Sequence, residues 1–150
     1  MKKVDLLKVT TIVKWVTIGL LILPLILYYF PYRKDISGFD MVRLAQAAGN
    51  GWQVEMFLRI LLPIIFSVIA GLILVKLNIV TAIISLILCL INRGIYSAYV
   101  SSYRGFGRGT AFGLEVMNAL NIICILLCIA LLVLTIIQMV KKKPQPTQQA

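Results

Sequence analysis

The sequence predicts an all-α fold: an integral membrane four-helix bundle with a short amphipathic helix in its first outer loop. The prediction rests first on composition, because 61% of the 150 residues are hydrophobic and 13% are charged, whereas soluble domains are about half apolar and a quarter charged. It rests second on the long apolar runs, and third on the positive charges beside those runs. This composition excludes a cytosolic enzyme, a disordered tail and a collagen-like fibre.

The first membrane span is predicted at residues 13–30, where an apolar run extends from Trp15 to Phe30. The run ends in Tyr-Tyr-Phe-Pro and not in the small residues of a signal-peptide cleavage site, so we expect an uncleaved span. Pro24 lies inside the run and is expected to bend the helix, because proline removes one backbone hydrogen bond.

The next apolar run, from Ile60 to Ile91, is too long for one span. A straight helix of this length would reach about 48 Å, beyond the hydrocarbon thickness of about 30 Å. It would also hold Lys76 near its centre, at a cost of about 2.5–3.5 kcal/mol. A tight turn at Val75–Ile79 removes both conflicts, so we predict a hairpin with spans at residues 57–74 and 80–99.

The fourth span is predicted at residues 111–140, followed by a polar tail at 141–150 that begins with three lysines. Four spans place both termini on one side, and each terminus carries a lysine cluster. Eight Lys and Arg residues then lie on that side and seven on the other. The positive-inside rule therefore predicts a multi-pass protein of the cell (inner or plasma) membrane, with both termini in the cytoplasm. We expect residues 1–150 to form a single membrane domain.

The first outer loop contains a predicted helix. Ser37-Gly-Phe-Asp40 has capping-box spacing, and Gly49-Asn-Gly51 ends the segment. The expected apolar face follows the i, i+3, i+4, i+7 pattern: Met41, Leu44, Ala45 and Ala48. Trp52 is expected to anchor the return near the headgroups. Two interpretations stay open, a lid that covers the helix ends or a surface that binds a partner.

Small residues recur at every fourth position around the second outer loop. The residues expected to pack closely are Gly94, Ala98, Gly105, Gly109 and Gly113. Such spacing lets two helix backbones approach each other, so it predicts a tight antiparallel pair between the third and fourth spans. The alternative is that the glycines only serve an irregular loop. An aromatic belt is expected around this pair: Tyr96, Tyr99, Tyr103 and Phe106.

Polar and charged residues lie at membrane depth in the outer halves of the spans: Arg59, Asn92, Arg93, Glu115, Asn118 and Asn121. We expect Arg93 and Glu115 to pair, because the third and fourth spans are antiparallel and an unpaired charge in hydrocarbon is costly. One interpretation is a set of interhelical hydrogen bonds that hold the bundle together. The other is a polar pathway or pocket, open to the outside, for an ion or a small anionic group.

Metal, cofactor and nucleic-acid functions are not expected. The chain has no histidine, and its three cysteines, Cys89, Cys124 and Cys128, all lie in predicted spans. Cys124 and Cys128 share a helix face, but apolar packing is the simpler interpretation. The net charge of +10 lies beside apolar runs, where it favours lipid headgroups over nucleic acid. An enzyme acting on lipid or thiol substrates is not expected either. The sequence offers no histidine, no cysteine pair in an outer loop and no cluster of acids for such chemistry.

Three features give the chain a recognisable layout. Ser37-Gly-Phe-Asp40 follows the first span, Gly109 to Gly113 precede the last, and Lys141 to Lys143 end it. In this layout most of the chain resembles a loose group of small bacterial four-span membrane proteins, which are claudin-like or tetraspan-like. The resemblance implies a fold more than a function. The chain departs from true claudins because it lacks a loop cysteine pair and a Gly-Leu-Trp signature, so no junction role is implied.

Two functions are consistent with these features. The first is a non-enzymatic membrane protein that works by helix association, as a subunit, assembly factor or protective partner of a membrane complex or of itself. Its expected partners are membrane lipid and another membrane protein or a second copy. The alternative is an oligomeric channel, or a small-ligand pathway, whose basic outer vestibule uses Arg59, Arg93 and Glu115.

Overall fold

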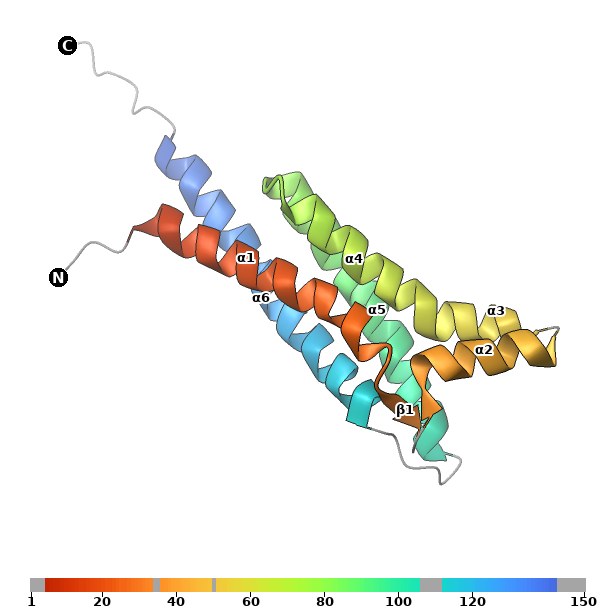
Figure 1. Ribbon diagram of the computed structural model, residues 1–150. Coiled ribbons are helices and arrows are strands. Elements are labelled where there is room, and N and C mark those ends of the chain that lie inside the picture. Colours follow the sequence, from red (N-terminus) through yellow and green to blue (C-terminus); the bar gives the residue numbers. More distant parts are fainter. Residues whose placement is uncertain (1–4, 34–35, 50, 106–111, 143–150) are drawn as a thin grey trace, which may run out of the picture.

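A computed structural model describes residues 5–33, 36–49, 51–105 and 112–142 and shows a bundle of long helices (Figure 1). Within these residues, four helices are long and apolar enough to cross a membrane: Leu6–Leu27, Trp52–Leu74, Ile79–Ser101 and Gly113–Lys141. The protein is therefore an all-α, multi-pass membrane protein, and the predicted fold class is confirmed. The start of the first span, the end of the fourth span and the turn between the second and third spans lie at one end of the bundle, here called the terminal end (Figure 1). The opposite end is called the loop end.

The first span is displaced relative to its predicted bounds. Helix α1 (Leu6–Leu27) begins before residue 13, because the Asp5 side chain accepts a hydrogen bond from the Leu7 N–H, 3.1 Å away, and so caps the helix. Thr10 and Thr17 are tolerated inside it, since each hydroxyl donates to a carbonyl one turn earlier. The helix ends at Leu27, before the predicted residue 30, and contains Pro24 in its last turn.

The predicted hairpin is confirmed. Helix α4 (Leu62–Leu74) and helix α5 (Ile79–Gly105) are joined by a short turn that carries the exposed Lys76. Asn78 and Thr81 cap α5 reciprocally. The Thr81 N–H donates to Asn78 Oδ1 at 2.9 Å, and the Asn78 N–H donates to Thr81 Oγ1 at 2.8 Å. These bonds satisfy amides that would otherwise lack a partner at a helix start.

The second span starts earlier than the predicted residue 57 and is not a uniform α-helix. It consists of α3 (Trp52–Met56), the π-helical segment η1 (Phe57–Leu61) and then α4. Pro63 accounts for the π turn, because it has no N–H to bond the Arg59 carbonyl one turn earlier. In η1 the Leu62 N–H bonds the Phe57 carbonyl, five residues back, and the helix continues through the proline.

Around the bundle, α1 packs against α4 and against α6 (Phe112–Lys142), and α5 packs against the same two helices. Helices α1 and α6 extend past the α4–α5 turn (Figure 1), where Gln138 Nε2 donates to Thr10 Oγ1 at 2.8 Å. The core has two apolar clusters. The loop-end cluster comprises Leu27, Ala45, Met56, Ile60, Ile64, Tyr96, Tyr99, Val100, Leu114 and Met117. The terminal-end cluster comprises Ile18, Leu21, Ala70, Leu74, Cys89, Cys124, Cys128 and Leu131.

The first loop forms a two-stranded antiparallel ribbon, which the sequence did not predict, and the predicted helix. Strands β1 (Pro31–Arg33) and β2 (Ile36–Ser37) lead into α2 (Gly38–Ala48). The predicted cap is confirmed, since the Asp40 N–H donates to Ser37 Oγ at 3.1 Å. Helix α2 lies beside α3, and the two project from the bundle (Figure 1).

The predicted apolar face of α2 is only half right. Met41 and Ala45 face the bundle, but Leu44 is 60% exposed and Ala48 is also exposed. The ribbon holds one end of α2 and α3 packs along it, and the resulting rotation turns Val42 inward in place of Leu44. Trp52, at the start of α3, is exposed.

Close backbone approach occurs at a glycine outside the predicted set. A Cβ on Gly71 of α4 would lie 3.5 Å from the Leu21 Cβ and 3.8 Å from the Ile18 carbonyl oxygen of α1. These are ordinary contact distances, so one methyl group fits there but a longer side chain does not. Gly71 therefore sets how closely α1 and α4 pack.

We predict that Gly71→Leu lowers the free energy of unfolding by about 1–3 kcal/mol, because it overpacks the α1–α4 contact. Gly71→Ala should stay close to wild type. Gly19→Leu is the matched control, since Gly19 is exposed on α1 and a Cβ there meets nothing within 4 Å. Unfolding in mixed detergent and dodecyl sulfate micelles measures all three. Equal losses for Gly71→Leu and Gly19→Leu would contradict this account.

Candidate functional site

A buried polar contact joins α4 to α5 at mid-bundle. Asn92 is completely buried, and its Nδ2 donates to the Pro63 carbonyl at 2.9 Å and to Ser67 Oγ at 3.0 Å. Nearer the turn, Ser85 Oγ donates to the Ala70 carbonyl at 3.0 Å. Such bonds align helices where lipid provides no hydrophobic drive for association. The sequence pointed to Asn92 but not to its partners, because serine and a proline carbonyl carry no distinct pattern.

A second polar contact joins α5 to α6, and it corrects a prediction. Arg93 Nη1 donates to Asn118 Oδ1, whereas the sequence predicted Glu115 as its partner. The antiparallel register sets Arg93 opposite Asn118, nearly one helical turn from Glu115. Glu115 lies at the exposed surface of α6. The other two polar residues predicted at membrane depth on α6 are Asn118, which is partly buried against Arg93, and Asn121, which is buried in the core.

Three buried oxygen atoms lie among these contacts without a hydrogen-bond partner in the described part of the chain: Asn92 Oδ1, Tyr96 OH and Asn121 Oδ1. Such an atom costs about 1–3 kcal/mol when it is buried and unpaired. These polar atoms lie where the two apolar clusters meet. Tyr96 belongs to the loop-end cluster, whereas Cys89, about one turn from Asn92 on α5, belongs to the terminal-end cluster.

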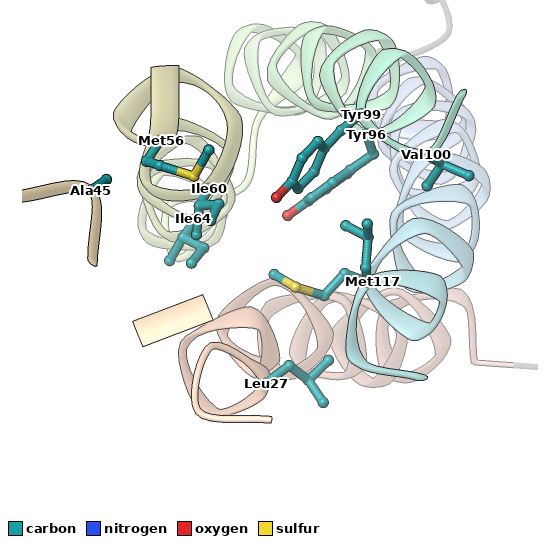
Figure 2. Packing of buried hydrophobic residues seen from close by; sticks show 10 residues of the cluster. Leu27, Ala45, Met56, Ile60, Ile64, Tyr96, Tyr99, Val100 and Met117 are labelled. Atoms are coloured by element: carbon teal, nitrogen blue, oxygen red, sulfur yellow. The ribbon is translucent and has the colours of Figure 1, made fainter. Parts of the chain in front are cut away.

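The aromatic belt predicted from Tyr96 and Tyr99 is wrong, because both rings are inside the bundle. Tyr96 is 2% exposed and Tyr99 is 1% exposed, and Figure 2 shows both rings pointing into the space enclosed by the helices. The Tyr99 hydroxyl donates to Met41 Sδ at 3.8 Å and so connects α5 to α2. The helical phase explains the error: Tyr96 and Tyr99 share the side of α5 that carries Asn92. The Tyr103 side chain and Phe106 lie outside the described residues.

Arg59 borders a groove between the second and third spans. Its Nη2 forms an ion pair with Glu55 Oε1 at 2.8 Å, and the two side chains are 36% and 38% exposed. Its guanidinium carbon lies 5.6 Å from the centre of the Tyr99 ring, which places the cation over an aromatic face. The groove has a volume of about 330 Å³ and is lined by Leu58, Arg59, Leu62, Ile95, Ala98 and Tyr99. The sequence could have indicated this ion pair, because Glu55 and Arg59 are spaced i, i+4 on a helix.

The small residues of α5 do not pack inside the bundle, which corrects another prediction. Gly94 and Ala98 are both exposed, and a Cβ on Gly94 would meet nothing within 4 Å. Ser97 and Ser101 are exposed on the same side of α5. The core instead receives the opposite side of α5, which carries Asn92, Tyr96 and Tyr99. We call the exposed set Gly94, Ser97, Ala98 and Ser101 the small-residue face.

The remaining predicted packing residues are only partly covered by the structure. Gly113, near the start of α6, is buried. Gly105 is the last residue of α5, and Gly109 lies outside the described residues. The three cysteines are buried and free in the terminal-end cluster. In the described ranges, no group of three His, Cys, Asp or Glu residues is arranged to hold a metal ion.

Comparisons with known protein families, with curated proteins and with solved structures found no match to this chain. The claudin-like resemblance accordingly remains a proposal. Two surfaces at membrane depth offer distinct chemistry for binding, the small-residue face and the groove beside Arg59.

We predict that Arg93 and Asn118 are energetically coupled and that Arg93 and Glu115 are not. In a double-mutant cycle, Arg93→Ala with Asn118→Ala should show a coupling of about 1 kcal/mol in the free energy of unfolding. The matched cycle of Arg93→Ala with Glu115→Ala should be additive within about 0.3–0.5 kcal/mol. Reversible unfolding in mixed micelles provides both values. Stronger coupling to Glu115 than to Asn118 would overturn the assignment.

Proposed function

We propose that this protein is non-enzymatic and works by helix association in the membrane, as a subunit, assembly factor or protective partner of a membrane complex or of itself. The observation that carries the proposal is the small-residue face. Gly94, Ser97, Ala98 and Ser101 lie one turn apart on the side of α5 that faces away from the core. A membrane helix of another chain approaches closely where the side chains are this small.

The chemistry of this face suits a protein partner. Close approach of two backbones increases van der Waals contact, which is the main attraction between helices in lipid. The hydroxyls of Ser97 and Ser101 add hydrogen bonds across the interface, where they have no competition from water. The open space at Gly94 leaves room for a side chain of the partner helix.

The channel alternative has less support. A pathway through one bundle would need a polar interior along its length, whereas two clusters of apolar side chains fill the core. The residues of the proposed vestibule also point to separate partners, since Arg59 pairs with Glu55 and Arg93 bonds Asn118. A pathway formed between several copies would have to use the outer surface of the bundle.

We also propose that the terminal end is cytoplasmic and that the membrane is the cell (inner or plasma) membrane. In support, lysines gather at this end. Lys14 Nζ donates to the Val75 carbonyl at 3.4 Å and lies 4.9 Å from the centre of the Trp15 ring, beside the turn that carries Lys76. A lysine held against an indole ring is typical of a membrane interface.

The association proposal predicts that the double variant Gly94→Leu, Ser97→Leu weakens association roughly tenfold or more, because two larger side chains hold the partner helix away. Energy transfer between donor- and acceptor-labelled copies in liposomes measures self-association. Quantitative co-purification from native membranes measures association with another protein. Gly19→Leu, the same kind of change on an exposed part of α1, should leave both unchanged. A wild-type protein that is strictly monomeric and co-purifies with nothing would refute the proposal.

The orientation proposal predicts accessibility from one side only. In intact cells, an impermeant maleimide should label Gln46→Cys at the loop end and should label Lys8→Cys and Lys141→Cys only after permeabilisation. All three positions are exposed, and the native cysteines are buried, so they provide little background. Labelling of Lys8→Cys or Lys141→Cys in intact cells would contradict the orientation.

A further inference from the structure

We infer that the groove between the second span and α5 is a binding site for an anionic phospholipid, with the phosphate at Arg59 and one acyl chain along the groove. This goes beyond the proposed association, because it concerns a different surface and a different ligand. The apolar part of the lining comes from Leu58, Leu62, Ile95 and Ala98, and Arg59 lies beside them in the same groove. An apolar groove with a cation in its lining matches the chemistry of such a lipid.

The depth of Arg59 fits a headgroup contact. Arg59 lies in the second span, and the exposed Lys76 lies in the turn that follows it, seventeen residues later, which is about 25 Å along a helix. The hydrocarbon layer is about 30 Å thick, so cations with this separation reach its two opposite edges. Between them, α4 exposes Ile65, Ile69 and Leu72, which suit contact with acyl chains. Arg59 is therefore at phosphate level in the leaflet of the loop end.

The Arg59 side chain is held in place before any ligand arrives. Glu55 forms an ion pair with Nη2, and the guanidinium carbon lies 5.6 Å from the centre of the Tyr99 ring. Arginine has five N–H donors, so several remain for a phosphate, which it binds as a planar, two-pronged donor. The ion pair with Glu55 is more than a third exposed and is correspondingly weak. It orients Arg59 and leaves most of its affinity for an anion.

Charge complementarity favours a lipid over a partner helix as occupant of this groove. Among the described residues, Arg59 is the one charged residue in the lining of an otherwise apolar groove, and a lipid phosphate is an anion that the headgroup region supplies at this depth. A partner helix has a better place to bind in the small-residue face, which points away from the core, whereas the groove opens to the side between two helices. Ala98 lies on the border between these surfaces.

The test is a titration of the delipidated, full-length protein in mild detergent with dioleoyl phosphatidylglycerol or dioleoyl phosphatidylcholine, followed by native mass spectrometry. We expect the wild type to bind phosphatidylglycerol roughly fivefold more tightly, which is the effect of one favourable cation near a headgroup. Arg59→Gln should abolish this preference. Arg43→Gln is the matched control, because Arg43 is exposed on α2 and the variant has the same net charge; it should keep the preference.

The acyl-chain contact is tested separately. Ile95→Trp fills the groove and should weaken binding of both lipids several-fold, whereas Ile122→Trp, the same change at an exposed position of α6, should have no effect. Should Arg59→Gln fail to fold, Glu55→Gln provides a second measurement. It removes the carboxylate that competes with the phosphate for Arg59, while the Tyr99 ring still lies beside the guanidinium, and so it should strengthen the phosphatidylglycerol preference.

Three outcomes would overturn the inference: equal binding of the two lipids by the wild type, equal loss of preference in Arg43→Gln and Arg59→Gln, or no effect of Ile95→Trp. The second outcome would indicate general charge attraction, and the third a headgroup contact without a groove. All these variants keep Gly94 and Ser97, so a failure here is distinct from a failure of the association proposal.

Discussion

The hydrogen bonds of Asn92 join α5 to α4 beside the proline that interrupts regular helical bonding, and the arrangement of the loop end depends on them. A polar group left unpaired in hydrocarbon is costly, so the bonds to Pro63 and Ser67 define both the height and the rotation of α5. That rotation turns Tyr96 and Tyr99 into the bundle. Tyr99 then contacts Arg59 of the second span through its ring and Met41 of α2 through its hydroxyl.

The same rotation gives α5 two sides with different properties. The side that carries Asn92 is filled with large residues and packs against α4 and α6. The opposite side carries the small-residue face and meets lipid or a partner. The π turn at Phe57–Leu61 belongs to the same arrangement, because it carries the helix through Pro63 and sets Leu58 and Arg59 along one wall of the groove.

The candidate site was only partly predictable, and the errors have one cause. Hydropathy and spacing identify residues that are unusual at membrane depth, such as Arg93 and Gly94, but not the direction in which each points. A shift of one turn between antiparallel helices exchanges Glu115 for Asn118 as the partner of Arg93. A modest rotation of α2 exchanges Leu44 for Val42. Partner choice depends on register and rotation, which are properties of packed pairs of helices.

The sequence by itself determined the features that rest on local chemistry: four apolar spans, the reversal at Lys76 and the cap at Ser37. Burial of a lysine in hydrocarbon and an uncapped helix start are penalised whatever the neighbouring helices do. Only the tertiary structure decided which side of α5 faces outward, where Gly71 brings two helices together and how Arg59 meets Tyr99. These contacts join residues far apart in the chain, and lipid-exposed and buried positions in a membrane are both apolar, so composition does not distinguish them.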